Sequence, residues 1–176
     1  ESMSRTSKDI SCFIARIGED LNAYTSNEYT CYYGSTLPEY LPELTGLFAD
    51  MLTNSLFSED ELIKEKAVVM DEIDMYNDSP EDLVHEKLQE AVWQGHPLSY
   101  LISGDKTSVE RISRDDLLAF YNEYYTGSNM IVSVAGNIGM AESELLAYFE
   151  NEFGRIPGGE RHDDRLTAPV YHETTL

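Results

Sequence analysis

Residues 58–78 read SEDELIKEKAVVMDEIDMYND, and this stretch carries the pattern that decides the fold. Ser58 is followed three residues later by Glu61, which is the capping-box pattern at the start of a helix. Apolar residues then recur at helical spacing and form one stripe, which comprises Leu62, Val69, Ile73 and Tyr76. The stretch therefore predicts a long helix that turns this stripe towards a core.

Two acidic residues of this helix, Glu65 and Glu72, are seven positions apart and lie on one line along its surface. At 100° per residue the line is roughly 60–80° from the apolar stripe, at the border of the buried face. A carboxylate there is costly unless it is paired or binds a cation, and the nearby bases Lys64 and Lys66 lie on other lines. Two interpretations follow: solvated surface acids, or part of a metal site.

Local patterns outside this stretch predict an α+β fold. Helical spacing of apolar residues predicts further helices over 7–17, 38–57, 81–92 and 143–153. Two runs rich in β-branched and aromatic residues, 21–24 and 29–35, predict strands joined by a short turn. A valine-rich run at 130–135 predicts a buried central strand, and Asp105 and Ser113 are candidate helix caps. Helices in runs with a few strands between them indicate a mixed β-sheet covered by helices.

Composition changes after residue 154, where Pro157-Gly158-Gly159 precedes a run of charged residues. Such a change is typical of a linker. We therefore expect a folded part over residues 1–155 and a linker, or the start of a following segment, over residues 156–176.

The charge balance limits the classes of partner. Thirty-three acidic and twelve basic residues give a net charge of -21, which repels polyanions, so we expect neither nucleic acid nor a membrane as partner. The acidity serves solubility or favours cationic peptides. No apolar run approaches the roughly 18 residues of a membrane-spanning helix, and the N-terminus lacks a visible secretory pattern. Two cysteines, Cys12 and Cys31, make no disulfide framework, so we expect a reducing compartment, the cytoplasm.

Two separate stretches resemble the pitrilysin or insulinase family of zinc metallopeptidases. Residues 61–83, ELIKEKAVVMDEIDMYNDSPEDL, resemble the segment that holds that family's distal zinc-ligand glutamate. Residues 18–37, GEDLNAYTSNEYTCYYGSTL, resemble its glycine, Asn-Ala-x-Thr and paired-tyrosine stretch. The motifs stand in the family's order and separation. A further match, NMIVSVAGNI at 129–138, extends the resemblance over nearly all of residues 1 to about 155.

By this resemblance, Glu72 corresponds to the zinc ligand and Glu65 to the nearby glutamate that supports the catalytic site from the same helix. The residues that match the family's substrate-pairing strand are Asn22, Ala23, Tyr24 and Thr25. The resemblance implies one zinc ion per intact domain, although nitrogen and oxygen ligands also suit other divalent ions. It identifies residues 1–155 as the distal part of a zinc-peptidase domain with a peptide substrate.

The remaining ligands of the resembled family are two histidines of a His-x-x-Glu-His helix, whose glutamate is the general base. This sequence contains neither that motif nor His-Glu-x-x-His, and its four histidines are scattered. We therefore expect the motif to precede residue 1 in a longer parent chain, so that the domain is truncated at its N-terminus. The chain alone is then expected to be catalytically inactive.

The resulting hypothesis is a zinc-dependent endopeptidase that hydrolyses peptides or small unfolded proteins, to which this chain supplies the distal ligand and the substrate strand. In the resembled family a second, homologous domain closes over the substrate, so we expect such a domain or subunit as partner, or a homodimer. One alternative is a non-catalytic structural or chaperoning subunit of the same family, against which the joint presence of Glu65 and Glu72 argues. A third interpretation is an acidic α+β binding module unrelated to proteolysis.

Overall fold

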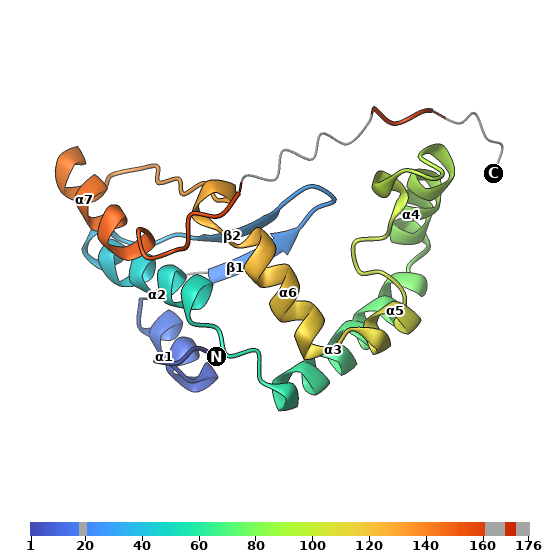
Figure 1. Cartoon of the computed structure of the whole chain (residues 1–176), viewed down its shortest axis with the longest axis horizontal. Coiled ribbons are helices and arrows are strands. Elements are labelled where there is room, and N and C mark those ends of the chain that lie inside the picture. Colours follow the sequence, from blue (N-terminus) through green and yellow to red (C-terminus); the bar gives the residue numbers. More distant parts are fainter. Residues whose placement is uncertain (18–20, 161–167, 172–176) are drawn as a thin grey trace. The chain divides into compact units, whose positions relative to one another are not determined.

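The computed structural model describes residues 1–17, 21–160 and 168–171, apart from the side chain of residue 82. The chain divides into two compact units. Unit 1 comprises the described residues of Glu1–Tyr24, Cys31–Phe57 and Leu118–His162. Unit 2 comprises those of Thr25–Thr30, Ser58–Leu117 and Asp163–Leu176. Helices with one small sheet make up the described chain, so the α+β class is confirmed (Figure 1).

Unit 1 contains most of the elements predicted for the two ends of the chain. They are α1 (Ser7–Ile17), β1 (Leu21–Thr25), β2 (Thr30–Gly34), η1 (Pro38–Tyr40), α2 (Leu41–Thr53), η3 (Gly127–Asn129) and α7 (Glu142–Phe153). The helix predicted over 7–17 is confirmed: Ile17 is buried, while Ile10, Phe13 and Ile14 on the same stripe are half-buried. The amphipathic pattern therefore fixes both the extent of α1 and the face that it buries.

The core of unit 1 lies where α2 packs against α7. Leu47 of α2 is fully buried and Leu145 of α7 is 7% exposed. The Tyr148 hydroxyl of α7 donates a hydrogen bond to the carbonyl oxygen of Pro42 at 2.6 Å. The helix predicted over 38–57 is shorter than expected, because it ends at Thr53 and the chain leaves helical geometry at Asn54.

The sheet is a two-stranded antiparallel hairpin of β1 and β2, and Thr25–Thr30 at its tip belongs to unit 2. Across the two strands, the rings of Tyr24 and Tyr33 meet edge to face with their centroids 6.0 Å apart. The turn is closed by a hydrogen bond from the Ser26 amide to the Tyr29 carbonyl oxygen at 2.8 Å. Both predicted strands are thus confirmed to within one residue or two at their ends.

The central strand predicted at 130–135 is wrong. These residues form no strand, and Ile131 is 94% exposed. An apolar run indicates a preference for burial, but a strand also needs a neighbouring backbone for its hydrogen bonds. No strand in the described part of the chain pairs with this segment. The sequence pattern therefore identified an apolar segment without identifying its partner.

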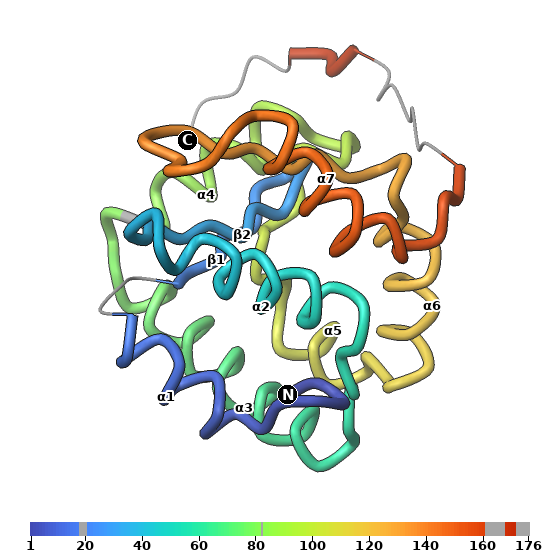
Figure 2. The backbone as a smooth tube through the Cα atoms, turned by 90° about the vertical axis from the view of Figure 1, so that its left-hand side faces the viewer, coloured from blue at the N-terminus to red at the C-terminus, as the bar shows by residue number. Residues whose placement is uncertain are grey.

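Unit 2 is built around α3 (Glu59–Asn77) and contains several further helices. They are α4 (Pro80–Val92), η2 (Pro97–Ser99), α5 (Lys106–Arg111) and the first residues of α6 (Arg114–Tyr124), which continues into unit 1. Both α4 and α5 contact α3, and Figure 2 traces the backbone through these helices. The main buried apolar side chains of this unit are Ile73 of α3 and Val109 of α5, each 7% exposed. Packing between α3 and α5 therefore supplies the core of unit 2.

The cap predictions have mixed outcomes. Ser58 is the N-cap residue of α3, but its side chain accepts no hydrogen bond, so the predicted capping box is wrong. Three acidic residues in the first turn stabilise this end of the helix instead, because their negative charges interact favourably with the positive end of the helix dipole. Asp105 does cap α5, and Ser113 forms reciprocal hydrogen bonds with Asp116 at the start of α6.

Two further expectations concern the whole chain. Within residues 1–17, 21–160 and 168–171, no helix combines the length and the apolarity needed to cross a membrane. The division at residue 155 stays a prediction.

Candidate functional site

The two predicted acids, Glu65 and Glu72, lie on one line of α3 and both are exposed. Between and beyond them on the same side of the helix lie Val68, which is 50% exposed, and Met75, which is 65% exposed. We call Glu65, Val68, Glu72 and Met75 the glutamate face. The apolar stripe beside it is buried at Ile73, where the predicted rotation of the helix is confirmed, whereas Tyr76 at the end of the stripe is 41% exposed.

The bases nearest to the glutamate face are engaged elsewhere. Lys64 pairs with Glu61 of the same helix, with 2.6 Å between its Nζ and Glu61 Oε1. Lys66 Nζ donates a hydrogen bond to the carbonyl oxygen of Glu110 at 2.9 Å. Among the described residues, neither Glu65 nor Glu72 has a hydrogen bond or an ion pair. The glutamate face therefore presents two uncompensated carboxylates beside exposed apolar side chains.

Whether these residues fit a zinc ion can be tested on the donor set. The described part of the chain contains no group of three or more His, Cys, Asp or Glu side chains that could hold a metal. Glu65 and Glu72 are about 10 Å apart along the helix axis, at 1.5 Å rise per residue, too far to bind one ion together. A catalytic zinc site needs about three protein ligands. The described residues supply fewer than three in any one place, so they do not form a zinc site by themselves.

Neither of the described histidines lies on α3 with Glu65 and Glu72. His96 is 8% exposed, and its Nδ1 accepts a hydrogen bond from the Leu98 amide at 3.2 Å, which caps η2. His85 is exposed on α4. The remaining two, at positions 162 and 172, lie outside the described residues.

The predicted substrate residues Asn22, Ala23, Tyr24 and Thr25 all lie on β1 and are exposed. Because the described sheet has two strands, β1 has one edge without a partner in that sheet. The Asn22 side chain reaches the backbone of the next residue: its Oδ1 accepts a hydrogen bond from the Ala23 amide at 2.8 Å. One backbone donor of this strand is therefore already taken by a side chain that could rotate away.

The two predicted acids share one helix, α3, and the four predicted substrate residues share one strand, β1. The structure does not place these two sets in one compact unit. Glu65 and Glu72 belong to unit 2, whereas the substrate residues Asn22, Ala23 and Tyr24 belong to unit 1 and the fourth, Thr25, to unit 2.

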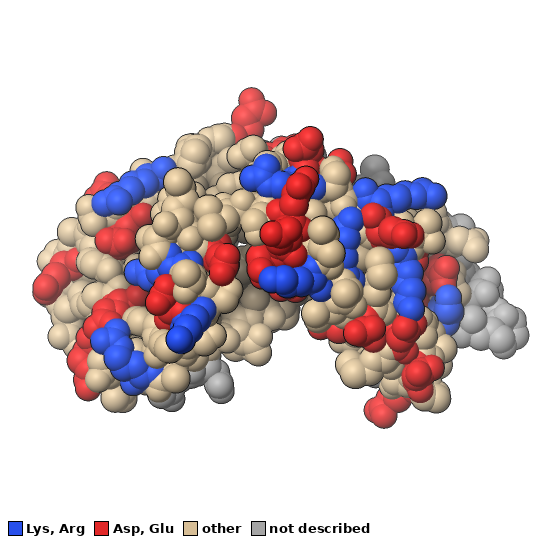
Figure 3. All heavy atoms as spheres, turned by 90° about the horizontal axis from the view of Figure 1, so that it is seen from below, with Lys and Arg blue, Asp and Glu red and all other residues tan. Residues whose placement is uncertain are grey.

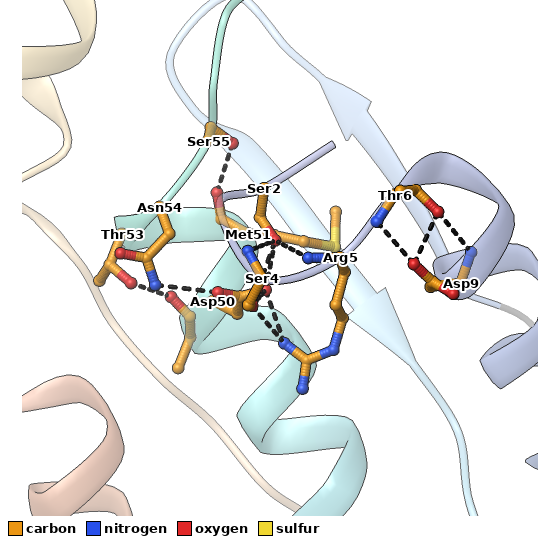
Figure 4. Close-up of polar contacts among 11 residues, drawn as sticks. Ser2, Ser4, Arg5, Thr6, Asp9, Asp50, Met51, Thr53, Asn54 and Ser55 are labelled. Carbon is orange, nitrogen blue, oxygen red and sulfur yellow. Dashed lines mark hydrogen bonds and ion pairs between the residues drawn. The ribbon is translucent and has the colours of Figure 1, made fainter.

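The structure also contains a polar cluster around Asp50 of α2 that sequence reasoning missed (Figure 4). Asp50 is 8% exposed, and its Oδ2 accepts hydrogen bonds from the Ser2 hydroxyl at 2.5 Å, the Ser4 hydroxyl at 2.8 Å and the Arg5 guanidinium at 2.6 Å. Its Oδ1 accepts one from the Asn54 amide at 2.9 Å. Burial by itself raises the pKa of Asp50, but these hydrogen bonds outweigh it and hold the pKa at about 2. The N-terminal segment is thus fastened to α2.

A second missed feature is a tyrosine contact in unit 1. The hydroxyls of Tyr32 on β2 and Tyr125 are 2.9 Å apart, and Tyr121 donates a hydrogen bond to the carbonyl oxygen of Leu52. Burial, followed by the hydrogen bond with Tyr125, raises the pKa of Tyr32. The paired tyrosines were visible in the sequence, but a partner 93 positions away was not.

The surface charge is less one-sided locally than the net charge indicates. On the face shown in Figure 3, acidic and basic side chains are interspersed.

Comparison with known proteins gives two family matches. Residues 1–106 match the family described as insulinase, peptidase family M16. Residues 111–175 match the family described as the peptidase M16 inactive domain.

Individual relatives agree with these matches. The uncharacterized zinc protease YmxG of Bacillus subtilis is 42% identical over 98% of this chain and 41% of its own length. An uncharacterized zinc protease of Rickettsia bellii is 35% identical over 90% of this chain and 38% of its own length. A protease from Helicobacter pylori has a similar fold, with a TM-score of 0.84 and 22% identity over 97% of this chain and 40% of that protein. The chain thus spans about two fifths of the length of these relatives.

Proposed function

The chain belongs to the insulinase family of peptidases, peptidase family M16, and from this we propose that it is one part of a zinc-dependent endopeptidase. In this proposal the full-length protein that carries the chain hydrolyses peptides or small unfolded proteins. The chain contributes Glu72 as a metal ligand, Glu65 as a supporting acid, and β1 as a strand that pairs with substrate.

The observation that carries the proposal is the glutamate face of α3. Exposed apolar side chains such as Met75 favour being covered by another element. An element that covers them also covers Glu72, and a covered carboxylate needs a cation or a hydrogen-bond donor to offset its lost hydration. A divalent ion shared between Glu72 and ligands on the covering element satisfies both requirements. Zinc is the ion that the names of the relatives support.

Hydrolysis itself is proposed for the full-length protein and not for this chain alone. Within the described residues no group of three or more His, Cys, Asp or Glu side chains accompanies Glu72 to complete a metal site. Glu65, about 10 Å away along the helix at 1.5 Å per residue, acts through its charge, which favours a cation on this side of α3.

The unpaired edge of β1 supports the role in substrate binding. An extended peptide adds to such an edge through backbone hydrogen bonds, which depend little on the peptide's sequence. The Ala23 amide becomes available to a substrate carbonyl when the Asn22 side chain releases it.

A second homologous domain or subunit is the proposed partner, either within one longer chain or in a homodimer. Two facts support it: the chain spans 41% of the length of its Bacillus subtilis relative, and residues 111–175 match a second family description.

The test is peptidase activity of the full-length protein on a fluorogenic unstructured peptide, before and after chelator treatment and zinc addition. We expect chelation to abolish turnover, zinc to restore it, and Glu72→Gln to abolish it irrespective of added zinc. The matched control is Asp71→Asn, which neutralises an adjacent exposed acid outside the glutamate face and keeps turnover. Full activity of Glu72→Gln contradicts the proposal. An inactive, metal-free wild-type protein supports the non-catalytic subunit instead.

A further inference from the structure

The helix α5 is too short to hold its position through its own backbone. It has six residues, well below the roughly 12 that an isolated helix needs for marginal stability. Its N-terminus is fixed by Asp105, whose carboxylate accepts hydrogen bonds from the amides of Thr107 at 2.8 Å and Ser108 at 3.0 Å. Val109 anchors it in the core of unit 2. The placement of α5 is therefore determined by its cap and its packing.

Two lysines connect the ends of this helix to α3. Lys106, the first residue of α5, pairs with Asp74 of α3, with 2.5 Å between Nζ and Oδ2. Near the other end of α5, the carbonyl oxygen of Glu110 accepts a hydrogen bond from Lys66 of α3 at 2.9 Å. That carbonyl is among the last four of its helix, which lack intrahelical partners. The start of α5 is connected to the C-terminal half of α3, and the end of α5 to the N-terminal half of α3. The two helices therefore run antiparallel.

The connections lie away from the glutamate face. At 100° per residue, Lys66 is about 120° and Asp74 about 160° from Glu72 around the axis of α3. Both therefore act on the sides of the helix that leave Glu72 accessible. Two attachment points separated by two turns oppose rotation of α3 about its own axis.

We propose that Lys66 and Lys106 are positioning residues, which fix the rotation of α3 and thereby the direction of the Glu72 carboxylate. This inference rests on the proposed function of Glu72 as a metal ligand. Exposed ion pairs contribute little to stability one by one, and here the Lys106 and Asp74 side chains are 47% and 58% exposed. The role of the two lysines is accordingly orientation and not stability.

The test uses the full-length protein with the double substitution Lys66→Met and Lys106→Met. We expect the dissociation constant for zinc, measured by competition with a chromophoric chelator, to rise about tenfold, as when groups that orient a ligand are lost. The melting temperature of the metal-free protein stays close to that of the wild type. The matched control is Lys87→Met, because Lys87 pairs with Glu90 of its own helix, α4, with 2.8 Å between Nζ and Oε2.

A charge exchange and two reference variants complete the experiment. Lys106→Asp weakens zinc binding, and adding Asp74→Lys to it restores binding, because the pair is re-formed with its charges exchanged. An unchanged zinc affinity in the double lysine variant overturns the inference. So does an equal loss of affinity in Val109→Ala, whose effect is on packing alone. If Glu72→Gln also leaves zinc affinity unchanged, the proposed function has failed; if it abolishes binding while the lysine variants do not, only the positioning role has failed.

Discussion

At the scale of single residues, Asp50 shows how a buried carboxylate is kept ionised. Its four hydrogen-bond donors come from Ser2, Ser4, Arg5 and Asn54, three of which belong to the N-terminal segment. A buried charge is tolerated when its hydrogen-bonding capacity is filled. Replacing Asp50 leaves all four donors without this acceptor, whereas replacing one donor leaves part of the hydrogen-bonding capacity of the buried carboxylate unfilled.

The lowered pKa of Asp50 predicts a pH dependence of the N-terminal contact. A carboxyl with a pKa of about 2 in the folded state and about 3.8 when released stabilises the contact fully above pH 4. That contribution, at most about 2 kcal/mol at 1.36 kcal/mol per pKa unit, is lost as the pH falls from 4 to 2. Hydrogen exchange of the Met3 amide, which donates to the Asn54 carbonyl oxygen at 2.9 Å, measures this local opening.

The control for this prediction is Asp50→Asn. The variant opens more readily at neutral pH, and its opening free energy lacks the decrease between pH 4 and pH 2. An Asp50→Asn variant with the same protection and pH dependence as the wild type contradicts a charged anchor.

At the scale of elements, the predictions that succeeded depend on residues close in sequence. The stripe that ends at Ile17 located α1, and the seven-residue spacing of Glu65 and Glu72 placed both on one line, because a helix sets these relations locally. The strand expected at 130–135 failed because pairing depends on a distant backbone that periodicity does not reveal. The donors around Asp50 were missed for the same reason, since three of them are 45 or more positions away.

A residue type that favours the N-cap position does not always form the capping hydrogen bond. Asp105→Ala removes two hydrogen bonds at the start of α5 and is expected to cost about 1 kcal/mol of local stability. Ser58→Ala, at the N-cap of α3, is expected to cost much less, because the Ser58 side chain makes no capping bond. Hydrogen exchange over 106–111 and over 59–62 compares the two. Equal losses of protection would show that the two caps do not differ as described.

At the scale of the whole molecule, the proposal gives this chain part of a site and not all of it. Its described residues offer Glu72 as one ligand, and β1 as a strand with an unpaired edge. This division was inferred from the sequence, where the spacing of Glu65 and Glu72 is recognisable and the His-x-x-Glu-His motif is absent, and it stays a prediction. Membership of the M16 family excludes the unrelated acidic binding module. It does not distinguish an active peptidase from a non-catalytic subunit.

The central claim is that Glu72 binds the metal of the full-length protein. The most direct measurement is a crystal structure of that protein with diffraction data on both sides of the zinc absorption edge. The account predicts an anomalous peak about 2.0–2.2 Å from a Glu72 carboxylate oxygen, as zinc–oxygen bonds require. A zinc peak remote from Glu72, or a zinc-saturated crystal with none on α3, would contradict it.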